Sequence, residues 1–371
     1  MKDNQILIIY GTDYTAMTLT LLERAQLAER LPAPSCRIGI KPNLVVPSPA
    51  SFGATTHPEV VEGIIQYLHA HGYENIVITE GSWVGDRTSE AYEYCGYRAL
   101  CEKYDIPFVD AQKDGSHALD CAGLRLNICN VVDSIDFLIN VPVLKGHCQT
   151  KITCALKNMK GLIPNTEKRR FHSMGLHKPI AHLSRGIRQD FIVVDHICGD
   201  LDFEEGGNPV VRNCIMAAVD PVLTDSYVCR LLHYTPDDVP YIRLAEALGS
   251  GSTDLDSAQI ITVGQEGETL PDEPAAERRI LQVAYAVDEV DSCSACYGSL
   301  VPALFRLHEE GLLDRLPVLI GIGQGHRGKS GALGIGRCTK DFDFCIMGCP
   351  PDEEKIYTEL KTYILERGTA T

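Results

Sequence analysis

Residues 137–147 read FLINVPVLKGH and give a clear indication of the fold class. The first part of this stretch, Phe137–Val141, is a short apolar run that predicts a buried strand. Its second part is more polar and carries Lys145 and His147 soon after the strand ends. Ligands of parallel α/β sheets bind outside the carboxyl ends of the strands, so charged residues at this position indicate a functional edge.

Six further apolar runs have a similar length and character. They are Ile6–Tyr10, Arg37–Lys41, Asn75–Thr79, Phe191–Asp195, Ile215–Val219 and Gln259–Val263. Between them lie stretches with helical periodicity, for example Pro58–His71, Thr88–Lys103, Thr224–His233 and Tyr241–Leu248. Alternating strands and helices predict an α/β fold, with a mostly parallel sheet covered by helices on both faces.

The length of 371 residues exceeds what one core usually supports, so we expect a large domain and a smaller one. Residues 264–279 are polar and acidic and predict the boundary. We therefore expect a large α/β domain over residues 1–270 and a smaller cysteine-rich α/β domain over residues 280–371.

Composition and charge narrow the classes of function. The apolar fraction of 44% and the charged fraction of 23% are those of an ordinary globular protein. A net charge of −16 argues against a nucleic-acid partner, which needs clustered Lys and Arg. The sequence shows no export signal and no apolar run long enough to span a membrane, so we expect a cytoplasmic protein with no membrane partner.

Cysteine spacing near the C-terminus predicts a metal centre. Cys293 and Cys296 form a Cys-x2-Cys pair, and Cys338 and Cys349 follow on separate segments. Four thiolates from three loops suit a [4Fe–4S] cluster. Structural zinc is the main alternative, although zinc sites usually use two short knuckles, and unligated buried cysteines are a further one. Cys345 is a fifth candidate, which we interpret as structural because it falls within a predicted strand.

The arrangement is similar to the proximal-cluster motif in the small subunit of nickel–iron hydrogenases. There a Cys-x2-Cys, an isolated Gly-x-Cys and a final Gly-Cys-Pro-Pro hold one [4Fe–4S] cluster, and residues 348–351 here read GCPP. The glycine-rich segment 321–331 lies between these cysteines and carries Arg327. It is either a flexible loop or an anion cradle, and in the second case Arg327 contacts the substrate.

Three polar segments directly follow predicted strands. They place Lys41, Glu80 and Lys145 at one edge of the sheet, and we interpret these residues, with His147, as catalytic candidates. The neighbouring residues that could bind a small anionic substrate or cofactor are Asn43, Thr56, His57, Lys157 and Asn158. The alternative is that each lysine merely leaves the sheet toward solvent.

These segments resemble the family called domain of unknown function 362. Its members show a Lys-x-Asn-Leu, a Thr-Thr-His-Pro, a Pro-x-Leu-Lys-x-His and an Ala-Leu-Lys-Asn-x-x-Gly in this order, as residues 35–265 do here. The resemblance implies an iron–sulfur module, which members often carry. This chain differs from many of them because it lacks the doubled Cys-x2-Cys-x2-Cys-x3-Cys pattern.

The leading hypothesis is an iron–sulfur oxidoreductase in which a C-terminal [4Fe–4S] cluster passes electrons to an anionic substrate or cofactor in the large domain. Its electron donor would be a ferredoxin or a flavoprotein. One alternative is an electron-transfer or scaffold subunit without a catalytic site. Another is a cluster-dependent lyase or isomerase, against which four cysteine ligands argue because they leave no open iron.

Overall fold

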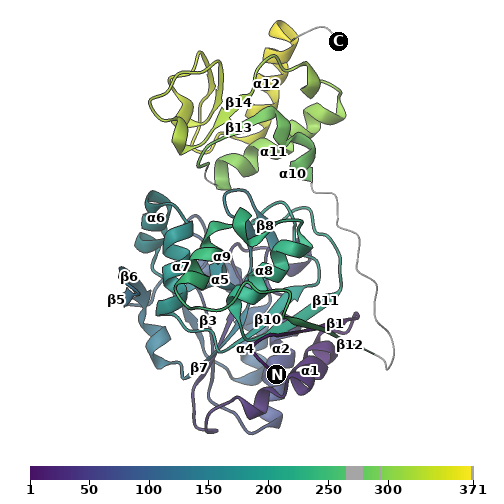
Figure 1. Cartoon of the computed structure of the whole chain (residues 1–371), viewed down its shortest axis with the longest axis vertical. Helices are drawn as coiled ribbons and strands as arrows, with labels where there is room; N and C mark the ends of the chain where they lie inside the picture. The colour runs from purple at the N-terminus through teal and green to yellow at the C-terminus, as the bar shows by residue number, and fades with distance from the viewer. Residues whose placement is uncertain (265–278, 293, 369–371) are drawn as a thin grey trace. The chain divides into compact units, whose positions relative to one another are not determined.

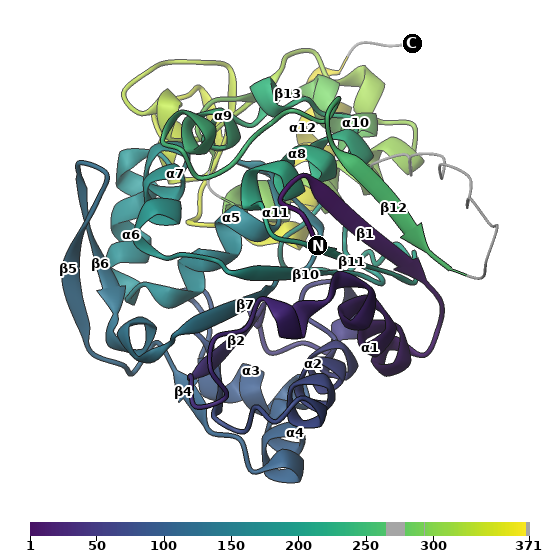
Figure 2. The same cartoon turned by 60° about the horizontal axis from the view of Figure 1, so that its bottom comes forward.

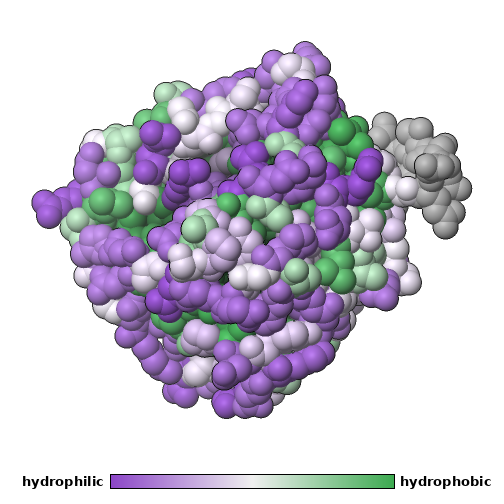
Figure 3. All heavy atoms as spheres, turned by 90° about the horizontal axis from the view of Figure 1, so that it is seen from below, coloured by the Kyte–Doolittle hydropathy of each residue, from purple (hydrophilic) through white to green (hydrophobic). Residues whose placement is uncertain are grey.

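The computed structural model describes residues 1–264, 279–292 and 294–368. The chain forms two compact units. Unit 1 comprises Met1–Gly146 and Thr150–Ala275, and unit 2 comprises His147–Gln149 and Ala276–Thr371. None of the helices within residues 1–264, 279–292 and 294–368 combines the length and the hydrophobicity of a membrane-spanning segment. One face of the molecule, drawn in Figure 3, is largely hydrophilic with small scattered apolar patches.

Unit 1 is built on an eight-stranded sheet with the order β12-β1-β11-β10-β7-β2-β3-β4. The strands are β1 (Gln5–Tyr10), β2 (Ile38–Pro42), β3 (Ile76–Glu80), β4 (Phe108–Asp110), β7 (Phe137–Val141), β10 (Phe191–His196), β11 (Cys214–Ala218) and β12 (Gln259–Val263). All neighbouring pairs are parallel except the two that involve β11, which runs antiparallel to β1 and β10. The predicted α/β fold with a mostly parallel sheet is confirmed.

Helices cover both faces of this sheet, as Figures 1 and 2 show. One face carries α1 (Tyr14–Ala25), α2 (Pro58–Ala70), α3 (Thr88–Tyr94) and α4 (Tyr97–Tyr104). The other carries α5 (Ala155–Asn158), α6 (Asn165–Met174), α7 (His177–Gly186), α8 (Pro221–Leu231) and α9 (Pro240–Ala247). The stretch 88–103, for which we expected helical structure, forms the two helices α3 and α4, because Gly96 with a φ of 81° separates them.

Alternation along the strands explains the packing on the first face. Ile38 and Ile40 of β2 point to the same side as Ile139 of β7, and α1 and α2 present Leu21 and Ile64 to them in one buried cluster. The structure also contains two small two-stranded sheets that we did not predict. They are formed by β5 (Ser116–Cys121) with β6 (Leu124–Cys129) and by β8 (Lys145–His147) with β9 (Lys151–Thr153).

Unit 2 contains a four-stranded parallel sheet in the order β13-β14-β15-β16. The strands are β13 (Val287–Glu289), β14 (Ile320–Ile322), β15 (Leu333–Ile335) and β16 (Phe344–Ile346). Its helices are α10 (Arg279–Val283), α11 (Ser294–Glu309) and α12 (Glu353–Arg367). Asp352 begins α12 because its side chain accepts hydrogen bonds from the backbone N–H groups of Glu354 and Lys355.

Candidate functional site

The site lies where the direction of the chain through the sheet reverses. From β2 the chain continues through α2 to β3, on one side of β2. From β7, the other neighbour of β2, it continues through α5–α7 to β10 in the opposite direction. The carboxyl ends of β2 and β7 therefore flank a topological switch point, where open α/β sheets bind their ligands.

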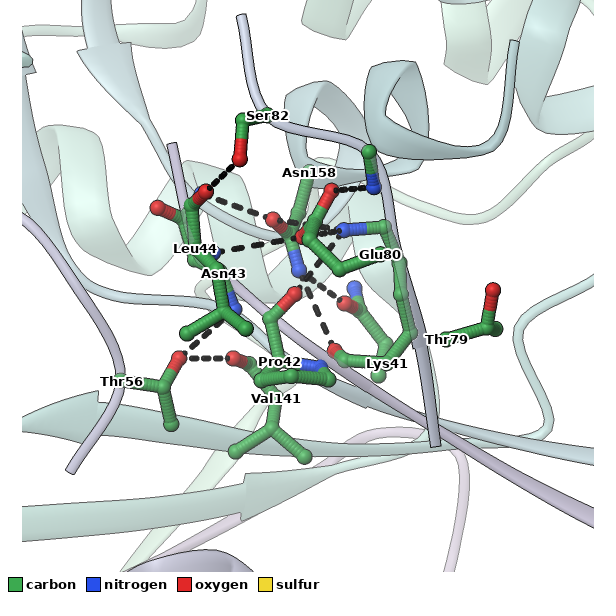
Figure 4. Close-up of polar contacts among 12 residues, drawn as sticks. Lys41, Pro42, Asn43, Leu44, Thr56, Thr79, Glu80, Ser82, Val141 and Asn158 are labelled. Atoms are coloured by element: carbon green, nitrogen blue, oxygen red, sulfur yellow. Dashed lines mark hydrogen bonds and ion pairs between the residues drawn. The ribbon is translucent and has the colours of Figure 1, made fainter. Parts of the chain in front are cut away.

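Lys41 and Glu80 form a buried ion pair at this edge (Figure 4). Their exposed side-chain fractions are 0% and 3%, and Lys41 Nζ lies 2.5 Å from Glu80 Oε2. The ammonium also donates to Pro42 O and Asn158 Oδ1. Glu80 Oε1 accepts from the N–H of Gly81 at 2.7 Å. Burial lowers the pKa of Lys41, whereas the charge of Glu80 raises it.

Gly161 closes over this pair. A Cβ on residue 161 would lie 1.8 Å from Glu80 Oε1 and 2.7 Å from Lys41 Nζ. Only a residue without a side chain allows the backbone to approach the ion pair this closely. The glycine at the end of the Ala-Leu-Lys-Asn-x-x-Gly segment therefore has a direct steric reason.

A network of amides holds the predicted residues together. Asn43 Nδ2 donates to Asn158 Oδ1 at 2.8 Å, and Asn158 Nδ2 donates to Asn140 Oδ1 at 2.7 Å. Thr56 Oγ1 accepts from the N–H of Asn43 and donates to Val141 O. These bonds connect the ends of β2 and β7 with α5, so the site is built on rigid elements.

Lys145 and Lys157 converge on the same region. Lys145 is fully buried, and its Nζ donates to Asn43 Oδ1, Ala54 O and Glu204 O. Burial lowers the pKa of Lys145 to about 8. Lys157 Nζ donates to Thr153 Oγ1 and lies 2.7 Å from Glu204 Oε1.

Two lysines that we did not predict as site residues complete the cluster. Lys168 is buried and donates to the carbonyls of Gly81 and Ser82, and burial lowers its pKa to about 8. Burial, with the positive charge of Lys157, lowers the pKa of Lys160 to about 7. Within the described part of the chain, the Lys160 ammonium has no hydrogen-bond or ion-pair partner.

These groups surround a small cleft, which we call the lysine cleft, with a volume of about 60 Å³. It is lined by Asn43, Val45, Glu80, Gly81, Trp83, Thr153, Lys157, Asn158, Lys160, Gly161, Lys168 and Glu204. Five ammonium groups, including Lys41 and Lys145 beside it, face the carboxylates of Glu80 and Glu204. Cations remain in excess even when Glu205, an exposed neighbour of Lys145, is counted.

His57 belongs to a different cluster. Its Nδ1 and its backbone N–H both lie 2.8 Å from Asp195 Oδ2, and its Nε2 lies 3.7 Å from Cys198 Sγ. Burial alone would lower the pKa of His57, but Asp195 raises it to about 10. The ring is therefore oriented toward Asp195 and Cys198, while its neighbour Thr56 joins the amide network.

Two further candidates belong to unit 2. His147 ends β8 and is grouped with unit 2. Its Nδ1 accepts a hydrogen bond from the N–H of Gln149. Arg327 also belongs to unit 2, and its Nε lies 3.4 Å from Cys338 Sγ. Within unit 1 the structure thus brings together Lys41, Asn43, Thr56, Glu80, Lys145, Lys157 and Asn158. His57 contacts Asp195 and Cys198 instead, and His147 and Arg327 belong to unit 2.

The loops that carry the cysteines of unit 2 lie close together. A Cβ on Gly336 would be 3.2 Å from Cys296 Sγ and 3.7 Å from Gly348 O. Gly336 precedes Cys338 by two residues, and Gly348 directly precedes Cys349. The N–H of Arg337 also donates to Gly348 O. Segments bearing three of the four predicted ligands therefore meet at one end of the sheet.

The fourth predicted ligand, Cys293, lies outside the described residues. Among the residues that are described, no group of three or more His, Cys, Asp or Glu side chains is arranged to hold a metal ion. Cys345 Sγ lies 3.4 Å from Gly336 O, so it contacts the same loop. The donor set of soft thiols on adjoining loops fits an iron–sulfur cluster or zinc.

Fold and site together define an α/β protein with a buried, lysine-rich cleft at a topological switch point. Residues 38–230 match the family described as Domain of unknown function (DUF362), and the chain belongs to this family. The resemblance drawn from the four sequence motifs is thereby confirmed.

Two further similarities are more distant. The chain is 26% identical over 246 residues to the thylakoid-associated protein sll1697 of Synechocystis sp., a match that covers 63% of this chain and 74% of that protein. Its structure is similar to that of the lactate racemase apoprotein from Thermoanaerobacterium thermosaccharolyticum, with a TM-score of 0.41 and 14% identity. That match covers 62% of this chain and 58% of the racemase.

Proposed function

We propose that unit 1 binds a small anionic substrate or cofactor in the lysine cleft, and that the chain is an iron–sulfur oxidoreductase acting on that ligand. The observation that carries the proposal is the excess of buried ammonium groups around the cleft. A buried charge without a counter-charge is costly, so a bound anion would compensate these lysines. The cleft is too small for a whole nucleotide but suits a carboxylate or a phosphate group.

The residues of the cleft would have different roles in binding the anion and in proton transfer. Lys157 and Lys168 would orient the anion as point charges, while the Lys41–Glu80 pair fixes the floor of the site. Lys160, with a pKa of about 7, could take or give a proton at its Nζ near neutral pH. Bound through Cys293, Cys296, Cys338 and Cys349, a [4Fe–4S] cluster would supply single electrons.

The affinity for sulfate, measured by calorimetry with chloride as the reference anion at matched ionic strength, tests anion binding. Lys157→Gln should weaken sulfate binding by about tenfold or more, because a hydrogen bond to a charged group is worth roughly 1.5–3 kcal/mol. Arg185→Gln is the matched control, since Arg185 lies at the other edge of the sheet. Equal sulfate affinity in both variants would refute the anion site.

The cluster is tested independently of turnover. Protein purified without oxygen should contain about four irons and four sulfides per chain and, once reduced, show a cubane electron paramagnetic resonance signal. Cys338→Ala should abolish the signal while leaving sulfate binding intact, and Cys345→Ala should preserve the signal. Colourless protein, or protein that contains zinc, would remove the redox proposal and leave the anion site standing.

A second candidate function is proton-transfer chemistry, as in a lyase or an isomerase. The lowered pKa of Lys160 favours it, because a neutral lysine beside other cations is a competent base near pH 7. Deuterium incorporation into small carboxylates in D2O, absent from Lys160→Gln, would support this function. The third candidate, an electron-transfer or scaffold subunit, predicts a stable complex with a catalytic partner and no effect of the cleft variants.

A further inference from the structure

The mouth of the lysine cleft carries the only tryptophan of the chain, Trp83. Its side chain is 41% exposed although it lines a cleft whose other walls are mostly polar. Val45, the other apolar side chain of the lining, lies beside it, and the N–H of Trp83 donates to Val45 O at 3.1 Å. An exposed indole at the rim of a cationic cleft offers a surface on which an apolar part of a ligand can pack.

The indole is held in place rather than left free to rotate. The indole Nε1 donates to Asp86, and the backbone carbonyl of Trp83 accepts from Gln112 Nε2 at 3.2 Å, which fixes the main chain that carries the ring. The backbone of Gly85 packs against the ring, since a Cβ on residue 85 would lie 2.1 Å from Trp83 Cζ2. A fixed ring loses little conformational entropy when a ligand stacks on it, so the ring is preorganised for stacking.

The cleft is large enough to hold only part of an organic ligand. Its volume of about 60 Å³ is far below the roughly 300–1,000 Å³ of pockets that enclose whole organic ligands. The anionic group alone therefore fits among Lys157, Lys160 and Lys168. The rest of the ligand must leave through the mouth, where Trp83 is exposed.

We infer that the ligand of the lysine cleft is a carboxylate or phosphate ester with a planar, conjugated body that stacks on Trp83. The inference rests on the proposed anion site and adds the chemical class of what the anion is attached to. Flat conjugated rings gain most from an indole face, because offset stacking adds to the burial of apolar area. A saturated body of similar size gains the burial alone.

The test compares inorganic phosphate, phenyl phosphate and cyclohexyl phosphate with the full-length protein. Phenyl phosphate should bind about tenfold more tightly than inorganic phosphate, and cyclohexyl phosphate no more than about threefold more tightly. Trp83 is the only tryptophan, so the tryptophan fluorescence of the protein reports on this side chain alone. It should change when phenyl phosphate stacks on the indole.

Variants separate this inference from the proposed function. In Trp83→Ala the advantage of phenyl phosphate, measured by calorimetry, should vanish while inorganic phosphate binds as before, and Trp83→Phe should restore part of it. An advantage that survives in Trp83→Ala, or an unchanged fluorescence in the wild type, would overturn the stacking inference and leave the anion site intact. Failure of all three phosphates to bind would overturn both.

Discussion

Two hollows of unit 1 that lie at opposite edges of the same sheet differ in size and in charge balance. The lysine cleft lies at the carboxyl ends of β2 and β7 and measures about 60 Å³. The second, which we call the arginine hollow, lies at the amino end of β10 and measures about 490 Å³. Its charged lining consists of Asp3, Arg30, Arg185, Arg188, Asp190 and Asp220.

The larger hollow is electrically balanced, whereas the smaller one is not. Arg188 Nε lies 2.7 Å from Asp190 Oδ1, and Arg30 NH2 lies 3.6 Å from Asp3 Oδ1. The Asp220 carboxylate accepts hydrogen bonds from the backbone N–H groups of Val222 and Leu223 in the first turn of α8. The arginine hollow thus needs no ligand, while the lysine cleft buries cations in excess. Uncompensated burial of charge is a better guide to function here than volume.

Removing a carboxylate from the lysine cleft should have the largest effect, and this effect should be a loss of stability. Glu80→Gln would leave Lys41 buried without its counter-charge, which should cost roughly 3–5 kcal/mol in the free energy of unfolding. Asp3→Asn removes the corresponding carboxylate of the exposed pair in the arginine hollow and should cost no more than about 1 kcal/mol. Urea denaturation measures both, and similar losses would contradict the contrast.

A steric variant should have the next largest effect. Gly161→Ala places a Cβ against Glu80 Oε1 and Lys41 Nζ, so we expect a loss of roughly 1–3 kcal/mol in the free energy of unfolding. The matched control is Gly264→Ala, because a Cβ there would meet nothing within 4 Å. Thermal unfolding distinguishes them, and an unaffected Gly161→Ala would show that the backbone over the ion pair can move.

Replacement of Lys160 should change the free energy of unfolding and the affinity for sulfate, and both changes should depend on pH. Its pKa is 10.5 in the unfolded chain and about 7 in the folded protein, so below pH 7 the folded state carries the full cost of its charge. Lys160→Met should therefore be more stable than the wild type at pH 6. This gain should shrink as the pH rises from 7 to 10.5, because the folded wild type has by then released the proton.

Sulfate binding should respond to pH in the complementary direction. Sulfate keeps its charge between pH 6 and 9, whereas Lys160 loses its proton near pH 7 and Lys145 and Lys168 near pH 8. Affinity for sulfate should thus fall steadily over this range, and the fall should be smaller in Lys160→Met. Calorimetry at constant ionic strength measures it, and a flat profile would show that these lysines do not face the anion.

The smallest effect is expected at the arginine hollow. Arg188 is 87% exposed in its pair with Asp190, so Arg188→Gln should change the free energy of unfolding by no more than about 1 kcal/mol. Its sulfate affinity should match that of the wild type. A clear loss of sulfate binding would mean that the balanced hollow, rather than the lysine cleft, holds the anion.

The pattern of apolar runs was sufficient to predict the α/β fold and the placement of Lys41, Glu80 and Lys145 at one edge of the sheet. The reversed direction of β11 was not predictable, because a buried strand reads the same in either direction. Lys160 lay within a segment that the sequence already singled out, but a lysine in a short helical stretch is usually exposed. Lys168 sat in a basic run that carried no signal of burial.

Local sequence therefore determined which residues end the strands, since strand formation depends on short-range apolar periodicity. It also determined the cysteine spacing on which the [4Fe–4S] proposal depends. Folding of the whole chain brings Lys160 and Lys168 to the cleft, orients His57 toward Asp195 and positions Gly161 over an ion pair. These contacts join residues distant in the chain, and burial and charge pairing become defined only when the chain is folded.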